Sequence, residues 1–299
     1  MRQSRKSHYD VASAVNQGQR DHQEDALIAD FPIGSDLGFA VLADGMGGHS
    51  AGDVASKIVV TEVFSELKLQ SGNTKEFEAK VHDILKNAAI AANECVMGHV
   101  RSNPETHGMG STLVAPVFIK NSLYWVSVGD SPLFLFREGI LRQLNEDHSM
   151  APQIDLMVSS GAMDADAAIN HPERNCLTSV LIGEDIARID CPKKPVKLED
   201  GDILIVASDG LQFLTNAKIS EILTKNNSRT SSQIADILLR ELDALGDPDQ
   251  DNITFSVVKV FHGDRQTTPQ NLHLADNQTD TEVGTFQFFR RSNVARDSA

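Results

Sequence analysis

An apolar run of strand length leads directly into an aspartate and a cluster of glycines at residues 39–48. The run, FAVLA, has the length and composition of a buried β-strand. We expect this strand to end at Asp44, with Gly45, Gly47 and Gly48 letting the backbone turn sharply and expose its carbonyl oxygens. The chain must therefore fold around a strand whose end presents a carboxylate.

The same pattern occurs again at residues 203–210, where the apolar run ILIVA is followed by Ser, Asp209 and Gly. Asp-Gly is a common turn, so a single copy would indicate no more than a turn. Further acids include Glu24 and Asp25 near the N-terminus and Asp251 just before the last apolar run. Carboxylates and carbonyls are the ligands that magnesium and manganese prefer. Together these acids predict an oxygen-lined site for a hard divalent cation.

Two other metal sites have little support in the sequence. No CxxC or HExxH pattern is present, so a zinc site is not indicated. Residues 247–252 imitate the opening of a calcium-binding EF-hand loop. However, Asn252 stands where the loop needs Gly, and Val258 stands where it needs Glu, so we reject that interpretation.

Composition is that of a soluble globular chain with an acidic balance of charge. The 299 residues are 40% hydrophobic and 23% charged, and the length is enough for one large domain or two ordinary ones. The net charge is −15 and no basic patch runs along the chain, so nucleic acid is a poor partner and we expect none. An acidic surface repels phosphate, so bound cations would be needed to attract it.

We expect the protein to be cytoplasmic. The N-terminus has no apolar signal segment, and no run approaches the roughly 20 apolar residues of a membrane span. The cysteines are odd in number and widely spaced, which is typical of reduced thiols. They are Cys95, Cys176 and Cys191.

Hairpin-length strands mixed with long helices, without regular βα alternation, predict an α+β fold. Strands are expected at 38–43, 112–119, 123–128, 132–137, 203–207 and 253–260. Helices are expected at 53–68, at 74–100 with Asn73 at its start, and over a third stripe ended by Gly246. Their apolar stripes, assigned to the core, include Val54, Ile58, Thr61 and Phe64 in the first helix and Ile234, Ile237, Leu238, Leu242 and Leu245 in the third.

Two segments stand apart from this core pattern. Residues 147–199 predict helices at 149–160 and 164–169 and a loop through 171–175, and one interpretation is a surface excursion with no role in substrate choice. Residues 263–299 are polar and without periodicity, so we expect a disordered C-terminal tail. Within it, the sequence FQFFRR at 286–291 could dock, add a strand or do nothing.

Seven motifs occur in the order typical of the metal-dependent type 2C protein phosphatases. They are RxxxED (20–25), DGMGG (44–48), GMGSTLVA (108–115), VGDSPLFLFREGILRQLNEDHS (128–149), HPERNCLTSVL (171–181), SDGL (208–211) and DN (251–252). The chain resembles the bacterial branch of this family over residues 9–262. The resemblance implies two antiparallel β-sheets sandwiched between helical layers, with a catalytic domain at 1–262 and a flap at about 147–190.

The resemblance also implies an activity: hydrolysis of phosphoserine and phosphothreonine in proteins by a metal-bridging hydroxide, opposing a serine/threonine kinase. The cofactors would be Mg²⁺ or Mn²⁺, two bound tightly and a third weakly. Such cations, roughly 3.5–4 Å apart, can hold a hydroxide in line with phosphorus and steady the leaving oxygen. The partners would be phosphorylated proteins, such as a serine/threonine kinase or its substrates, and we expect a monomer.

The family motifs assign roles to the acids. Asp44 would bridge both metals, and the Gly45 carbonyl would complete the shell of one. Asp209 and Asp251 would hold the other metal. Glu24 and Asp25, which align with family acids, would either bind directly or orient metal-bound water.

Three further positions matter. Arg20 matches the family's phosphate-binding arginine, whose planar fork can grip two phosphoryl oxygens. Asp130 aligns with an acid that shares a weak third metal with the residue matching Asp209, although it could merely cap a turn. Met46 stands where the eukaryotic branch has a His as candidate general acid, so metal-bound water or another group must protonate the leaving group. His49 is near in sequence and receives no role.

Two alternatives remain open. The chain could be a dedicated partner-switching phosphatase that acts on one regulatory protein. The reaction would then be the same, and only the range of substrates would be narrower. It could also be a pseudophosphatase that binds phosphoproteins without turnover. The intact acids at the metal positions argue against the second alternative.

Overall fold

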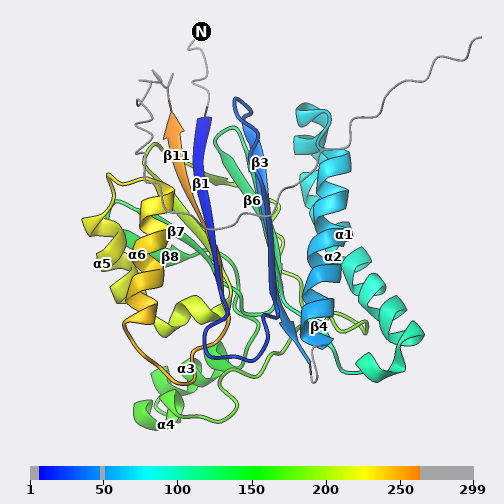
Figure 1. Cartoon of the computed structure of the whole chain (residues 1–299), viewed down its shortest axis with the longest axis vertical. Coiled ribbons are helices and arrows are strands. Elements are labelled where there is room, and N and C mark those ends of the chain that lie inside the picture. The colour runs from blue at the N-terminus through cyan, green and yellow to red at the C-terminus, as the bar shows by residue number, and fades with distance from the viewer. Residues whose placement is uncertain (1–6, 48–50, 263–299) are drawn as a thin grey trace, which may run out of the picture. The chain divides into compact units, whose positions relative to one another are not determined.

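The computed structural model describes residues 7–47 and 51–262, and these residues form four layers. Two antiparallel sheets pack face to face, and a pair of helices covers the outer face of each sheet (Figure 1). The predicted α+β sandwich of two antiparallel sheets between helical layers is therefore confirmed.

The first sheet has the strand order β1-β11-β10-β7-β8 in the described part of the chain. Its strands are β1 (Ser7–Asn16), β7 (Leu133–Arg137), β8 (Ile140–Gln143), β10 (Ile203–Ala207) and β11 (Ile253–His262). The first and last described strands pair along their whole length, Ser7 with His262 and Asn16 with Ile253. The two ends of the described chain are thereby held in one sheet.

The second sheet has the order β2-β3-β5-β6-β9, and β4 pairs with the end of β3. Its strands are β2 (Asp25–Asp30), β3 (Leu37–Met46), β4 (Gly110–Ser111), β5 (Leu113–Ile119), β6 (Ser122–Val128) and β9 (Val196–Lys197). β5 is buried at every residue because it is covered on both faces. Its near-continuous apolar sequence follows from that position.

Helices α1 (Ala51–Gln70) and α2 (Thr74–Ser102) cover the second sheet. Asn73 caps α2, as expected, by accepting a hydrogen bond from the backbone of Glu76. Helices α5 (Asn216–Lys225) and α6 (Ser231–Asp243) cover the first sheet, and α6 begins with a capping box formed by Thr230 and Gln233.

A separate apolar core fills the space between the two sheets. It takes alternate residues from the facing strands, because successive side chains of a strand point to opposite faces. Its buried members are Ala40, Leu42, Val114, Phe118, Leu123, Trp125, Leu133, Leu135, Leu198, Leu204, Val206, Val258 and Val260. Each sheet is thus apolar on both faces, one against helices and one against the other sheet.

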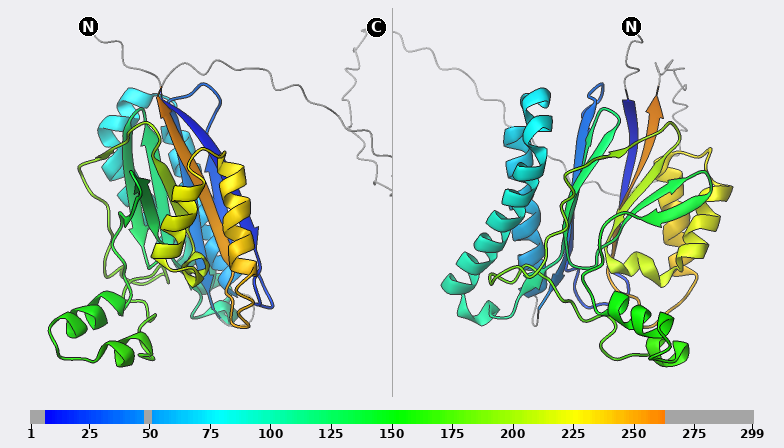
Figure 2. Two further views of the ribbon diagram at one scale, coloured as in Figure 1. Left: turned by 90° about the vertical axis from the view of Figure 1, so that its left-hand side faces the viewer. Right: turned by 180° about the vertical axis from the view of Figure 1, so that it is seen from behind.

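Residues 147–190, which we call the flap, leave the layers after β8 and return before β9. They contain α3 (Ala151–Ser159) and α4 (Ala165–Ile169), close to the two predicted helices, and a turn through 171–175. Figure 2 shows these helices in green at one end of the sandwich, outside the stacked layers. Two short 3₁₀ turns, η1 (Pro104–Thr106) and η2 (Asp209–Phe213), complete the described elements.

Two expectations about local structure were wrong, and a third was confirmed in part. β3 does not end at Asp44 but runs to Met46, because Gly45 and Met46 pair with β4. The expected stripe of α1 is the part-confirmed one: Val54, Ile58 and Phe64 are half-buried against the core and Thr61 is exposed, whereas the fully buried residues include Ala55, Val59, Val63 and Leu67. Leu245 lies beyond the end of α6 and is 48% exposed.

Some expectations fall outside the described residues: Gly48, His49 and the tail at 263–299. No helix within residues 7–47 and 51–262 is both long enough and apolar enough to cross a membrane.

Candidate active site

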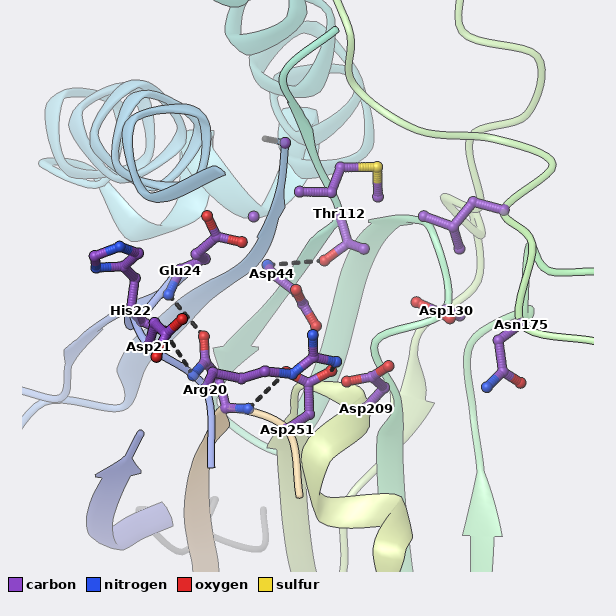
Figure 3. Close-up of a pocket in the computed structure, with 15 residues that line it drawn as sticks. Arg20, Asp21, His22, Glu24, Asp44, Thr112, Asp130, Asn175, Asp209 and Asp251 are labelled. Carbon is purple, nitrogen blue, oxygen red and sulfur yellow. Dashed lines mark hydrogen bonds and ion pairs between the residues drawn. The ribbon is translucent and has the colours of Figure 1, made fainter. Parts of the chain in front are cut away.

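A pocket of about 650 Å³ opens at the end of the sandwich where the flap lies (Figure 3). Its walls come from both sheets, from the loop before β2 and from the base of the flap. The lining residues are Arg20, Asp21, His22, Glu24, Asp44, Gly45, Met46, Gly47, Thr112, Asp130, Asn175, Leu177, Asp209, Asp251 and Asn252. All but one of the acids expected at the site are on this wall, and the exception is Asp25.

Asp44 is the acid that β3 delivers into the space between the sheets. It lies on the same face of the strand as Ala40 and Leu42, which pack in the inter-sheet core. Its backbone is fixed on the neighbouring strand, since its N–H donates to Thr112 Oγ1 at 2.9 Å and its carbonyl accepts from Thr112 N at 2.8 Å. Burial, followed by the charge of Asp25 and those of other nearby aspartates, raises the pKa of Asp44 well above its usual range.

Gly45 is required by a close approach of three chain segments. A Cβ at this position would lie 2.0 Å from the carbonyl oxygen of Gly52 and 2.6 Å from that of Glu24. The Gly45 N–H donates to the same Glu24 carbonyl at 3.2 Å. The glycine therefore serves tight packing rather than the sharp turn that we expected.

Glu24 lies against the first turn of α1. A Cβ on Gly52 would be only 2.7 Å from Glu24 Cδ, so the carboxylate occupies the space that a side chain would fill. Burial, followed by the charge of Asp53, raises the pKa of Glu24, although a hydrogen bond from the Gly52 backbone opposes this shift. Its carboxylate could bind a cation in the pocket directly.

Asp25 lies beneath the pocket wall, in the contact between the sheets. Its Oδ2 accepts a hydrogen bond from Ser208 Oγ at 2.7 Å, and its buried Oδ1 has no hydrogen-bond partner in the described structure. Burial is the main cause that raises the pKa of Asp25 to about 7, and the charges of Asp209 and Asp251 add to it. A buried carboxylate with one free oxygen could receive a hydrogen bond from water in the pocket.

Asp209 and Asp251 come from the opposite sheet. Asp209 begins η2 just after β10, and Asp251 precedes β11. The two loops are in close contact, since a Cβ on Gly210 would lie 2.0 Å from the Asn252 carbonyl oxygen. Burial and then the charge of Asp251 raise the pKa of Asp209. The site is thus assembled from two sheets, each bringing its own aspartates.

Asn252 is a structural tie that the sequence reasoning missed. Its Oδ1 accepts from the Glu24 N–H at 2.7 Å, and its Nδ2 donates to the carbonyls of Gln17 at 2.8 Å and His22 at 3.0 Å. One amide therefore holds the loop before β2 against the start of β11. Asp21 and His22, carried by that loop, were also not expected on the pocket wall.

Arg20 extends into the pocket from the same loop. Its Nη2 donates to Asp251 Oδ2 at 2.6 Å, and 58% of its side chain is exposed. A guanidinium at a pocket mouth, with most of its surface accessible, can still offer donors to an incoming anion.

Asp130 lies in the turn between β6 and β7 and lines the pocket with Asp209. Burial, then Asp209 and Asp147, raises the pKa of Asp130 to about 7. The carboxyl is therefore part of the pocket's acid wall.

The donor set fits hard divalent cations. Every candidate ligand is an oxygen, and the raised pKa values of Asp25, Asp44, Asp130 and Asp209 have burial and like charge as causes, which a bound cation would offset. Among the described residues, no three His, Cys, Asp or Glu side chains are already gathered closely enough to clasp one ion. The acids instead line the wall around a shared space.

Comparison with known proteins gives a consistent result. Residues 15–244 match the family model described as Protein phosphatase 2C. A relative, the serine/threonine phosphatase stp of Listeria innocua, is 32% identical over 225 residues, which are 73% of this chain and 83% of that protein.

Solved structures share the fold as well. The crystal structure of the serine/threonine phosphatase PstP/Ppp of Mycobacterium tuberculosis is similar with a TM-score of 0.70 at 28% identity, covering 85% of this chain and 99% of that one. A structure of the PstP catalytic domain in complex with two manganese ions is similar with a TM-score of 0.65 at 28% identity, with the same coverage.

Proposed function

This chain belongs to the protein phosphatase 2C family and is a protein serine/threonine phosphatase, and we propose that it hydrolyses phosphoserine and phosphothreonine with divalent cations held by the pocket acids. The observation that carries the proposal is the convergence of Asp44 from one sheet with Asp209 and Asp251 from the other, on a pocket that Arg20 enters. The wall is acidic, so it suits a phosphate substrate only with cations between the two.

Each acid has a role in this proposal. Asp44 would contact two Mg²⁺ or Mn²⁺ ions, with the Gly45 carbonyl completing one shell, and Asp209 and Asp251 would hold the second ion. When bound, the cations would supply a bridging hydroxide as nucleophile and the positive charge that offsets the phosphate. Glu24, on the pocket wall, would bind directly, and Asp25, beneath it, would orient water.

Arg20 and Asp130 act on substrate and on the weaker cation. The Arg20 guanidinium would turn from Asp251 to the phosphoryl oxygens, because the cations would neutralise that carboxylate. Asp130 would share a loosely held third ion with Asp209. Met46 lines the pocket and has no proton to give, so the leaving oxygen would take its proton from water or from another group.

The wider setting is also a proposal. We place the catalytic domain at residues 1–262, with the flap at 147–190 beside the pocket and the tail at 263–299 outside the domain. The enzyme would work as a cytoplasmic monomer and oppose a serine/threonine kinase. A single dedicated regulatory phosphoprotein as substrate is the narrower alternative, and binding without turnover is the opposing one.

Hydrolysis of p-nitrophenyl phosphate and of a phosphothreonine peptide would test the proposal. We expect turnover of both with Mg²⁺ or Mn²⁺ and none with excess chelator, with recovery when the metal is returned. Full activity in chelator, or activity with zinc alone, would contradict the oxygen-ligand assignment. Tight peptide binding without phosphate release would favour the non-catalytic alternative.

A further inference from the structure

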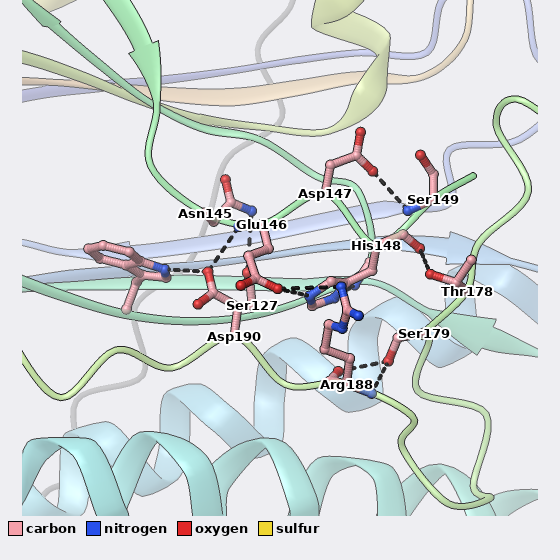
Figure 4. A network of polar contacts seen from close by, with 12 residues as sticks. Ser127, Asn145, Glu146, Asp147, His148, Ser149, Thr178, Ser179, Arg188 and Asp190 are labelled. Carbon is pink, nitrogen blue, oxygen red and sulfur yellow. Dashed lines mark hydrogen bonds and ion pairs between the residues drawn. The ribbon is translucent and has the colours of Figure 1, made fainter. Parts of the chain in front are cut away.

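His148 is fully buried at the point where the chain enters the flap (Figure 4), and it forms hydrogen bonds with two separate segments. It does not line the pocket, and none of the roles proposed above involves it. Its contacts nevertheless reach the turn that carries Asp130 and a later part of the flap, at Thr178.

The first contact is a reciprocal pair of hydrogen bonds with Gly129. The His148 N–H donates to the Gly129 carbonyl at 3.1 Å, and the Gly129 N–H donates to His148 Nδ1 at 3.2 Å. Gly129 has a φ of 101°, and a Cβ there would lie 2.6 Å from Thr112 Cγ2. The turn is therefore held between Thr112 on one side and His148 on the other, and Asp130 is its next residue.

The second contact joins the start of the flap to Thr178, which follows the two flap helices. The His148 carbonyl accepts from both the backbone N–H of Thr178, at 2.7 Å, and its Oγ1, at 2.8 Å. The next residue, Ser149, forms a β-bridge with Leu177, which lines the pocket. The chain segments on either side of the two flap helices are thus held together at His148 and Ser149.

The ring itself is oriented for the Gly129 contact. Because Nδ1 accepts a hydrogen bond, the neutral ring carries its hydrogen on Nε2. That atom has no hydrogen-bond partner among the described residues, and Glu146 Oε2 lies 3.7 Å away. Glu146 is in turn 3.6 Å from Arg188, so the carboxylate is held at the end of the flap. Its charge favours the tautomer that leaves Nδ1 free to accept.

We propose that His148 is a positioning residue that couples the flap to Asp130. Movement of the flap at His148 or at Thr178 would be transmitted through the His148–Gly129 pair to the Asp130 carboxyl. A cation held by that carboxyl would in return order the flap. The inference rests on the proposed function, because it takes Asp130 as part of a cation-binding wall.

The test compares three variants in the full-length protein. His148→Asn keeps an oxygen acceptor near the Nδ1 position, His148→Leu removes it, and His107→Leu makes the same change at an exposed histidine off the pocket. Two readouts are taken: the Mn²⁺ concentration for half-maximal turnover of a phosphothreonine peptide, and amide hydrogen exchange in residues 147–190 with and without Mn²⁺.

We expect His148→Leu to raise the Mn²⁺ requirement about tenfold and to abolish the slowing of flap exchange by Mn²⁺, since losing an orienting partner weakens metal sites by this order. His148→Asn should recover most of both, and His107→Leu should match the wild type. Loosened exchange in His148→Leu with an unchanged Mn²⁺ requirement, or no recovery in His148→Asn, would overturn the coupling.

Two provisions keep the test decisive. If His148→Leu does not fold, Thr178→Val removes only the hydroxyl contact, and it must weaken the Mn²⁺ effect on flap exchange for the proposal to stand. If the wild type shows no turnover, the proposed function fails, yet the exchange measurements still decide the coupling. Wild-type flap exchange that ignores Mn²⁺ would refute the inference by itself.

Discussion

Asp25 and Asp44 lie directly opposite each other in the antiparallel pairing of β2 with β3. Directly opposed residues project their side chains from the same face of a sheet, so both carboxyls face the first sheet. Burial is the main cause that raises the pKa of both carboxyls, and the charge of Asp25 adds to the shift of Asp44. The pairing therefore places two like charges where only a cation or a proton can offset them.

Replacing Asp44 by Asn should separate activity from stability. We expect kcat to fall at least about 100-fold, because a carboxylate that would contact both cations is lost. In chelator, the melting temperature should rise, since Asn has the same shape and removes one of several buried like charges. Steady-state kinetics and thermal unfolding check both parts. A variant with more than a few per cent of wild-type turnover would contradict the bridging role.

Replacing Arg20 by Ala should act mainly on substrate binding. We expect KM for a small phosphoester to rise roughly 10- to 100-fold with a smaller change in kcat, as for the loss of a charged hydrogen-bond donor. Arg20→Lys keeps the positive charge but loses the planar guanidinium, so its KM should lie between those of the wild type and of Arg20→Ala. Equal KM values in all three proteins would show that the guanidinium stays on Asp251 and does not reach the phosphate.

The metal-free protein should lose stability as the pH rises from about 4 to 8. The folded-state pKa of Asp25 and of Asp130 is about 7, above the 3.8 of the unfolded chain. The native state therefore keeps protons that the unfolded state has already released, and this stabilisation disappears as the pH passes through 7. Denaturant unfolding in chelator at a series of pH values measures the effect.

Two controls accompany the pH series. Saturating Mn²⁺ should make the free energy of unfolding nearly independent of pH, because cations replace the protons. In chelator, Asp25→Asn should reduce the change of this free energy with pH. The buried His148 has the opposite effect on the pH dependence. Burial lowers its pKa in the folded state, so stability falls below about pH 6.5, where this histidine is protonated in the unfolded chain but not in the folded one. A metal-free protein that grows steadily more stable from pH 5 to 8 would contradict the raised carboxyl pKa values.

Removing residues 263–299 should leave activity on p-nitrophenyl phosphate near normal. β11 ends at His262, and its pairing with β1 is complete within the described chain. Turnover and thermal unfolding of the shortened protein check the expectation. Insoluble protein, or a melting temperature well below that of the full chain, would show that the tail belongs to the folded domain.

The sequence predicted the strands whose apolar runs are long. β3, β5, β6, β7, β10 and β11 all overlap their predicted ranges. β1 and β2 were not predicted, because SHYDVASAVN and DALIAD mix polar and apolar residues on strands at sheet edges. The apolar stripe of α1 was predicted only in part. The small Ala55 is fully buried in the core, whereas the larger Val54 and Ile58 are half-buried against it.

The candidate site was predicted as a set of residues but not as an arrangement. Motif positions named six acids, of which Glu24, Asp44, Asp130, Asp209 and Asp251 share one pocket. That Asp25 lies beneath the wall depends on its contact with Ser208, far along the chain. Such contacts between distant segments leave no local trace in residue spacing.

The aspartates of the pocket belong to two sheets, and an apolar layer fills the space between these sheets. Leu42 and Val258 in that layer have no polar chemistry, yet they fix how far apart the two groups of acids stand. A change of volume at either position would move one group of acids relative to the other before it unfolded the protein. The apolar side chains between the sheets therefore help to set the spacing of the acids, on which a two-metal reaction depends.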